Sequence, residues 1–483
     1  MNRKMICYML GQLIKLEGAL MVLPLICSIL YREHDSMTAF AVTIIFALAV
    51  GFTLTALNRK CDRTIYAREG FVITALAWIV FSVIGSAPFV ISGAIPNPVN
   101  AFFETVSGFT TTGASILTEV ESLDRGILFW RSFTHWIGGM GILVLMMAIL
   151  SDNTGRAIHI MRAEMPGPIV DKISPRIKNT AKILYLIYLG ITVIEVIFLL
   201  CGGMSLYESL VHTFGTVGTG GFGVKNDSIA GYTPYLQWVI TIFMLLSGVN
   251  FNLYYLLLCR RYRQAALSEE LWFYLGIIFI SIGVITLNIA HLYPTASETL
   301  RQAFFQVSSI LTTTGYATTD YNLWPNLSKT VLFLLMFIGG CAGSTAGGLK
   351  VSRLILLVKM GRRELHQLLH PRAVRILKFE GKPLDNAKTR SVGTYFGLYC
   401  LCFMAFFLIL SCDPGEGLNM ETNMTAVAAC FNNIGPGFAG VGPTSNFSGY
   451  TDFSTLLLSF AMLMGRLEIY PILLICFPKK IVK

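Results

Sequence analysis

Charged residues are scarce in this sequence. They make up 13% of the 483 residues, against ~25% in an average soluble domain, while hydrophobic residues reach 54%. No soluble core needs so much apolar chain, so the composition excludes an ordinary soluble protein and predicts an all-α polytopic membrane protein. The net charge of +10 does not indicate a nucleic-acid partner, because the basic residues lie in alternate loops between apolar runs.

Patterns that carry enzymatic chemistry are also missing. The eleven cysteines form no CxxC pair and no regular framework, which predicts buried thiols and neither disulfides nor a metal site. His366 and His370 have helical spacing, but Gln367 stands where a zinc protease places its general base. The glycine-rich string 218–223 lacks the strand and helix context of a nucleotide-binding fold. We therefore expect no enzyme and no catalytic cofactor.

Long apolar runs are what the sequence does contain. Ten of them match the ~30 Å of a hydrocarbon core. They lie at about 8–31, 37–58, 69–92, 126–150, 181–203, 234–258, 271–293, 327–358, 390–412 and 453–477. Most basic residues lie at both chain ends and in connections 59–68, 156–182, 260–263 and 359–390. The positive-inside rule places those connections and both termini in the cytoplasm.

A shorter apolar piece, 99–109, lies between the third and fourth runs. It is too short to cross the membrane, so it must enter and turn back. Re-entrant backbone is tolerated at that depth only where protein buries it or water reaches it, which predicts a pore. The piece leads into Thr-Thr-Thr-Gly113. Carbonyl oxygens of such a string can face one axis, with Gly113 supplying a positive φ.

The same hairpin occurs four times, at intervals of roughly a hundred residues, so one chain can supply a complete ring. The expected filter carbonyls belong to Thr111, Thr112, Gly113, Gly218, Thr219, Gly220, Thr313, Thr314, Gly315, Asn433, Ile434 and Gly435. No acidic residue lies within these strings, which favours a monovalent over a divalent cation. Only one glycine is shared by all four, which predicts less strict selectivity than a longer filter would give.

The repeats divide the chain into five units. We expect a two-helix accessory unit at 1–68. Four pseudo-symmetric helix, pore loop, helix repeats follow around a central pore, at 69–180, 181–270, 271–389 and 390–483.

A glycine-rich string interrupts the run at 327–358. Its glycines at 339, 343 and 347 also form a small-xxx-small face, for which helix packing alone is a sufficient explanation. Five glycines in ten residues nevertheless cost a helix ~1 kcal/mol each, so we expect a break. The proposed gate loop comprises Gly339, Gly340, Gly343, Ser344, Thr345, Gly347, Gly348 and Lys350. Lys350 and Arg353 either act on passing ions or mark the inner membrane boundary.

Arg466 falls near the middle of the last apolar run. An arginine there costs at least ~2.5 kcal/mol, so its side chain should face protein or water. One interpretation is a charge barrier below the filter, and the other is an ion pair with another helix. His135 and His212 are interpreted as packing or interfacial residues, with a proton relay as the alternative.

Acidic residues mark the side that carries the filter loops. They are Glu119, Glu121, Asp124, Asp320, Asp413, Glu416 and Glu421. They either concentrate cations at the mouth or keep the loops soluble.

The four filter loops, Met165-Pro-Gly-Pro168, the string 339–348 and Gly465-Arg-Leu-Glu-Ile-Tyr470 together resemble the Trk/Ktr/HKT family of potassium transporters. The two leading helices are similar to the bacterial Trk-type membrane subunit. This resemblance implies potassium uptake across the cytoplasmic membrane, a homodimer with one pore per protomer, and a cytoplasmic ring of nucleotide-binding regulatory subunits. It also implies that serine at position 113 would admit sodium.

Two alternatives stay open at this stage. The basic loops 156–182 and 359–390 are docking surfaces for a regulatory subunit, or they bind anionic lipid of the bilayer. The transport mode is a gated pathway, or a symporter tightly coupled to protons or sodium.

Overall fold

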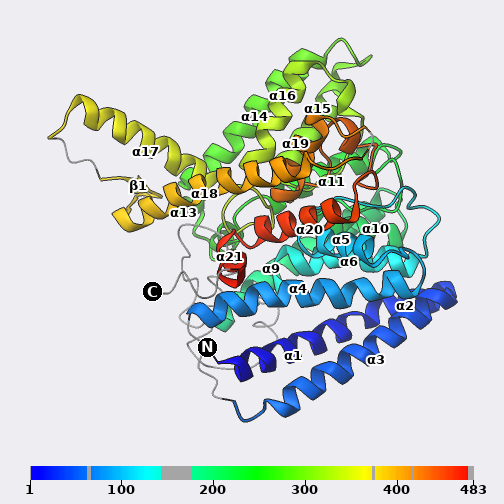
Figure 1. Cartoon of the computed structure of the whole chain (residues 1–483). Helices are drawn as coiled ribbons and strands as arrows, with labels where there is room; N and C mark the ends of the chain where they lie inside the picture. The colour runs from blue at the N-terminus through cyan, green and yellow to red at the C-terminus, as the bar shows by residue number, and fades with distance from the viewer. Residues whose placement is uncertain (1, 62–66, 143–176, 373–375, 416, 477–483) are drawn as a thin grey trace.

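A computed structural model describes residues 2–61, 67–142, 177–372, 376–415 and 417–476. Helices form nearly all of their regular structure (Figure 1). The strands found among these residues are β1 (Lys378–Phe379) and β2 (Lys382–Pro383), a short antiparallel pair. The predicted all-α class is confirmed.

Several helices are long and apolar enough to cross a membrane. They are Arg3–Tyr31, His34–Leu57, Glu69–Ile91, Ala181–Cys201, Glu269–Ile289 and Asn386–Leu410. A seventh span arises if Pro234–Ser247 and Phe251–Leu258 are counted together across their 91° bend. The chain is therefore a multi-pass membrane protein. The remaining predicted runs are divided into shorter helices or, beyond Ile142, continue outside the described residues.

The helices follow the predicted order of one leading pair and four hairpins. The leading pair is α1 (Arg3–Leu20) continued by α2 (Val22–Tyr31), and α3 (His34–Leu57). The first hairpin contains α4 (Ala67–Ile91), α5 (Pro98–Phe109) and α6 (Arg125–Gly139). The second contains α9 (Ile177–Cys201), α10 (Leu206–Val217), α11 (Pro234–Ser247) and α12 (Phe251–Leu258).

The third hairpin follows a short helix, α13 (Tyr262–Ala266). It contains α14 (Glu269–Ile289), α15 (Ala296–Leu311), the 3-10 turn η1 (Tyr321–Leu323), α16 (Asn326–Ile338) and α17 (Val351–Leu369). The fourth contains α18 (Asn386–Leu410), α19 (Met420–Phe431), the 3-10 turn η2 (Ala439–Val441), α20 (Asp452–Arg466) and α21 (Tyr470–Cys476).

Each hairpin has a short second helix. Helices α5, α10 and α19 have 12 residues and α15 has 16. At a rise of ~1.5 Å per residue, none of them spans a core of ~30 Å. All four begin at a polar cap whose side chain accepts a backbone N–H. These caps are Asn97, Ser205, Thr295 and Asn419. The pieces predicted to be too short to span a membrane are therefore short capped helices.

Four of the predicted long runs are broken. The break between Ile338 and Val351 follows the glycine content, as expected. The prediction of continuous helices over 126–150, 234–258 and 453–477 is wrong. Helix α6 ends at Gly139, just before Gly141, which has a φ of 86°. Helix α11 ends before Gly248, and α20 ends at Arg466, after which Glu468 and Ile469 adopt positive φ.

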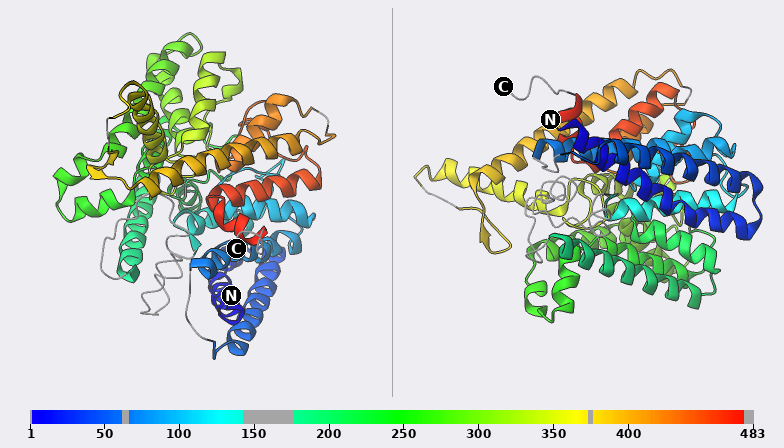
Figure 2. Two further views of the ribbon diagram at one scale, coloured as in Figure 1. Left: turned by 60° about the vertical axis from the view of Figure 1, so that its left-hand side comes forward. Right: turned by 90° about the horizontal axis from the view of Figure 1, so that it is seen from below.

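The leading pair lies on one flank of the molecule. Helices α1 and α3 pack against each other and against α4, away from α14 to α16 (Figure 2). The start of α1, helix α21 and the projecting helix α17 lie toward one side of the molecule (Figure 1). That side also carries the β1–β2 pair.

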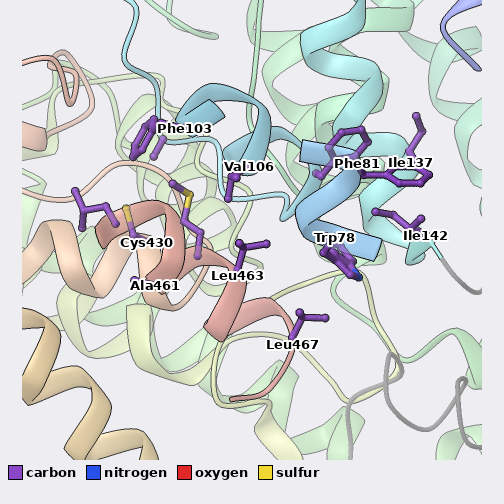
Figure 3. Packing of buried hydrophobic residues seen from close by; sticks show 14 of the residues in the cluster. Trp78, Phe81, Phe103, Val106, Ile137, Ile142, Cys430, Ala461, Leu463 and Leu467 are labelled. Carbon is purple, nitrogen blue, oxygen red and sulfur yellow. The ribbon is translucent and has the colours of Figure 1, made fainter. Parts of the chain in front are cut away.

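The first and fourth hairpins share an apolar core. Trp78 and Phe81 of α4, Val106 of α5, Ile137 of α6 and Leu463 of α20 are buried in one cluster (Figure 3). Inside a bilayer the hydrophobic effect does not drive helices together, because lipid tails are as apolar as the side chains. Close packing of side chains therefore holds these helices together. This core joins the two ends of the four-hairpin series.

Candidate functional site

The same backbone turn follows each short helix. Its central residue has a left-handed φ of 55° or 56°, in Thr111, Thr219, Thr313 and Asn433. The next amide returns to a carbonyl five residues earlier, always at 2.8 Å. These bonds are Thr112 to Ser107, Gly220 to Gly215, Thr314 to Ser309 and Ile434 to Ala429. The four hairpins therefore share one loop geometry, which aligns them residue by residue.

A glycine with positive φ ends each turn. The four are Gly113, Gly221, Gly315 and Gly435, with φ of 78°, 82°, 86° and 103°. The register predicted for the second loop is therefore wrong by one residue. Thr219 corresponds to Thr111, and Gly218 lies one position before the string. Two adjacent glycines made both registers compatible with the sequence, and the hydrogen bonds select one.

These glycines bring the loops together in a closed ring. A Cβ on Gly113 would lie 2.0 Å from the Gly220 oxygen, and one on Gly221 would lie 2.1 Å from the Thr314 oxygen. The series continues from Gly315 to the Ile434 oxygen at 2.2 Å, and from Gly435 to the Thr112 oxygen at 2.7 Å. Each loop thus approaches the next, and the fourth returns to the first. Glycine is required at all four positions by φ and by space.

Side chains of the strings are buried, and several of them hydrogen-bond to protein. The hydroxyls of Thr110 and Thr112 lie 2.8 Å apart, as do those of Thr312 and Thr314. Asn433 donates from Nδ2 to the Thr112 hydroxyl and to the Met462 carbonyl, each at 3.0 Å. The bond to Thr112 ties the fourth loop to the first.

A cavity of about 160 Å³ opens at the glycine end of the strings. It is lined by all four glycines and by the segments that follow them. All four strings therefore run in the same direction. Its lining includes Arg131 and Lys225 and, in the described part of the chain, no carboxylate.

Four of the predicted acidic mouth residues have structural contacts. Glu121 accepts the Asn226 amide, Asp124 lies 2.5 Å from the Ser36 hydroxyl, and Asp320 caps η1. Asp413 accepts the Thr451 hydroxyl at 2.6 Å. Glu416 lies outside the described residues. These contacts favour the interpretation in which the acids serve the loops.

One important ion pair was missed from the sequence. Glu104 of α5 and Arg131 of α6 are buried, with Oε1 and Nε 2.5 Å apart. Glu104 also accepts the Ser115 hydroxyl and the Ile116 amide, just after Gly113. A carboxylate inside the short apolar piece 99–109 was the signal, because such a group needs a partner at that depth.

The predicted gate loop touches the ring from the opposite end of the strings. The Gly347 amide donates to the Thr313 hydroxyl at 2.6 Å, and a Cβ on Gly347 would lie 2.5 Å from the Asn432 oxygen. The predicted loop residues Gly339, Gly343, Gly348 and Lys350 all have positive φ. Residues of a right-handed α-helix have negative φ, so the helix breaks at these positions.

The gate loop also packs on the break between α11 and α12. The Cys341 amide donates to the Gly248 carbonyl at 2.9 Å, and the Thr345 hydroxyl donates to the Ser247 carbonyl at 3.2 Å. Gly340 approaches the same Gly248 carbonyl, while the Ser344 hydroxyl bonds within the loop. Two broken helices therefore support each other.

A buried carboxylate clamps both ends of the gate loop. Oε1 of Glu270, at the start of α14, accepts the Ala342 amide at 2.7 Å and the Ser352 amide at 3.2 Å. Glu380, between β1 and β2, accepts the Ser268 hydroxyl at 2.9 Å and the Glu270 amide at 3.1 Å. Two hydrogen bonds, both through Glu270, thus connect the β1–β2 turn to the gate loop.

Arg466 anchors the other side of the gate loop. It donates to the Thr345 carbonyl at 2.8 Å, and to the Gly138 and Gly139 carbonyls at 2.5 and 2.8 Å. It ends α20, so its predicted mid-helix position is wrong. A cavity of about 50 Å³ separates these elements, and Lys350 and Arg466 both line it.

The charged residues beside Arg466 have partners of their own. Lys350 is buried and its ammonium donates to the Ala346 carbonyl within the gate loop. Arg353 of α17 pairs at 2.5 Å with Glu468, which lies in the break between α20 and α21. Arg353 is thus a structural partner, and Lys350 belongs to the gate loop.

Comparison with known proteins identifies the family of this chain. A family model described as cation transport protein, TrkH, matches residues 36–481. This chain belongs to the TrkH family. The family relationship predicted from the motifs is confirmed, as is the prediction of a transporter that is no enzyme.

Relatives of this TrkH-family chain match it along its whole length. The Trk system potassium uptake protein TrkH of Escherichia coli K12 is 38% identical, covering 99% of each chain. The Trk system potassium uptake protein TrkG of the same strain is 35% identical and covers 98% of this chain. The crystal structure of the potassium transporter TrkH from Vibrio parahaemolyticus superimposes with a TM-score of 0.89, at 33% identity and 99% coverage of both chains.

Proposed function

We propose that this chain carries potassium ions into the bacterial cytoplasm through the ring of four strings. With the corrected register, the strings are Thr111–Gly113, Thr219–Gly221, Thr313–Gly315 and Asn433–Gly435. The closed approach of each glycine to the next loop's carbonyl carries this proposal. Potassium exchanges its water for carbonyl dipoles readily, and a ring of buried backbone provides them. Relatives named as potassium uptake proteins support the choice of ion.

Gating falls to the loop 339–348 in this proposal. Its Gly347 is bonded to a filter string, and Arg466 ties it to the end of α6. Opening then requires the loop to leave Thr313 while its anchors shift. The guanidinium beside the inner cavity adds a positive charge that slows ion exit.

The hydrogen bonds of Glu380 and Glu270 connect the β1–β2 turn to the gate loop, and through them the cytoplasmic side can control the gate. A cytoplasmic nucleotide-binding regulatory subunit docks, in this proposal, on the basic segment 359–390, with 156–182 as a second surface that lies outside the described residues. The β1–β2 pair lies within the first segment. A homodimer with one pore per protomer, cytoplasmic termini and the five-unit division at 68, 180, 270 and 389 complete the proposal.

The competing function is symport tightly coupled to protons or sodium. Alternating access commonly rests on repeats of opposite orientation. Here all four strings open into one outer cavity, so the repeats have one orientation, which favours a gated pathway.

Reversal potentials of the purified protein in planar bilayers test this function. With an impermeant organic cation opposing potassium, we expect a potassium current without sodium and reversal near the potassium equilibrium potential at every pH. A reversal potential that moves with the proton gradient at constant potassium, or a potassium current that requires sodium, would show coupled symport and overturn the proposal.

A further inference from the structure

The second filter string is built differently from the other three. Loops one and three place threonines at both ends of the turn, with their hydroxyls 2.8 Å apart. The corresponding positions of loop two are Gly218 and Gly220. The fourth loop has Asn432 and Ile434 there, both buried. Only the second loop lacks side chains behind its turn.

His135 of α6 fills that space. A Cβ on Gly220 would lie 2.2 Å from Cγ and 2.3 Å from Nδ1 of the imidazole. A Cβ on Gly218 would lie 2.6 Å from the His135 carbonyl oxygen. The φ of Gly220 is not in the left-handed region, so backbone strain does not require glycine. The imidazole alone excludes a side chain at Gly220.

His135 also contacts the first loop. Its Nδ1 lies 2.7 Å from the Gly108 carbonyl oxygen, and this oxygen also accepts the Thr111 amide at 3.1 Å. A carbonyl oxygen can only accept, so Nδ1 carries a proton there. The ring lies on Phe222, with centroids 4.2 Å apart, and is fully buried. One side chain therefore links the turns of two neighbouring strings.

We propose that His135 is a selectivity-determining positioning residue of the ring. The imidazole replaces the missing side chain of the second loop and holds the Gly220 carbonyl against Gly113. Discrimination between potassium and sodium depends on where coordinating carbonyls lie, so loss of this support loosens one quarter of the ring. This inference rests on the proposed filter.

Substitutions at His135 and Gly220 test it through the potassium-to-sodium permeability ratio in bilayers. His135→Ala should lower the ratio roughly tenfold, the size expected when a contact that fixes a buried polar group is lost. Gly220→Thr should abolish potassium flux, because the new side chain meets the imidazole. The double variant His135→Ala/Gly220→Thr places threonine where Thr112 and Thr314 stand. It should restore flux and return the ratio to within about threefold of the wild type.

Leucine at position 135 separates the volume of the ring from its hydrogen bond. In His135→Leu, Cγ and the two methyl groups fill the space that Cγ, Nδ1 and Cδ2 of the imidazole fill beside Gly220, but the donor to the Gly108 carbonyl is lost. We expect its ratio to match that of the wild type. A ratio as low as that of His135→Ala would assign the effect to the hydrogen bond and overturn the space-filling role.

Other outcomes also bear directly on the inference. A wild-type ratio in His135→Ala, or equal flux in Gly220→Thr with and without His135, would overturn it. All variants are compared at matched monodispersity in size-exclusion chromatography, which excludes misfolding as the cause. If Gly113→Ser changes the ratio while the His135 variants do not, the filter stands and only this inference fails. If neither does, the filter assignment fails.

Discussion

Gly113 meets two separate demands at once. Its φ of 78° disfavours any side chain, and the Gly220 oxygen occupies the place of a Cβ. Gly93 meets only the first, because it has a φ of 76° and nothing within 4 Å of its Cβ position. The comparison separates backbone strain from contact within the ring.

Gly113→Ser should therefore admit sodium. The added side chain must displace the Gly220 carbonyl, and we expect the potassium-to-sodium permeability ratio to fall roughly tenfold. Gly93→Ser, with the same strain and open space, should keep the wild-type ratio. An unchanged ratio in Gly113→Ser would remove this glycine from the filter.

Arg466 is placed to restrain the gate loop by its fork of donors and by its charge. Arg466→Ala should raise potassium flux per molecule about tenfold, because the bonds to Thr345, Gly138 and Gly139 are lost together. Arg466→Lys keeps the charge but not the planar fork, so its flux should be intermediate. Fluorescence-normalised flux into proteoliposomes is the readout. Lower expression with unaltered flux per molecule would leave Arg466 with a purely structural role.

Among the elements, the gate loop depends on contacts far from it in the chain. Glu270 accepts amides from both of its ends, and Glu269, the preceding residue, only pairs with Lys359 at a partly exposed site. Exposed pairs contribute little to stability, whereas a buried acceptor of two amides is costly to remove. Glu269 therefore serves as the control position for substitutions of Glu270.

Glu270→Ala should release the gate loop. We expect a roughly tenfold higher open probability in single-channel recordings, since two buried amides lose their acceptor. Glu269→Ala should behave as wild type. Equal effects of the two substitutions, or none from Glu270→Ala, would show that this clamp does not control the gate.

The elements also show where sequence reasoning succeeds. The four hairpins and the broken run at 327–358 follow from apolar length and glycine content, which are local properties. The bend after α11 has only short local signals, namely Gly248 at the end of α11 and the cap residue Asn250 before α12. Its Gly248 carbonyl accepts the Cys341 amide from the gate loop, a partner that no pattern near Gly248 indicates. Tertiary hydrogen bonds of this kind decide where an apolar run stops being helical.

At the scale of the whole molecule, four loops from distant parts of the chain form one ring. The ring was predictable because each loop repeats the same glycine turn. Its register in the second loop was not, since Gly220 and Gly221 are chemically identical and differ only in their neighbours. His135 could not be assigned either, because its position behind Gly220 depends on how α6 packs against the loops.

The ring as an ion site is the central claim, and anomalous scattering from crystals soaked in thallium or rubidium tests it most directly. We predict a peak on the axis encircled by the four strings, between Gly113, Gly221, Gly315 and Gly435. The peak should weaken when potassium is added back and persist when sodium is added. An axis without anomalous density, with the ions bound elsewhere, would contradict the account.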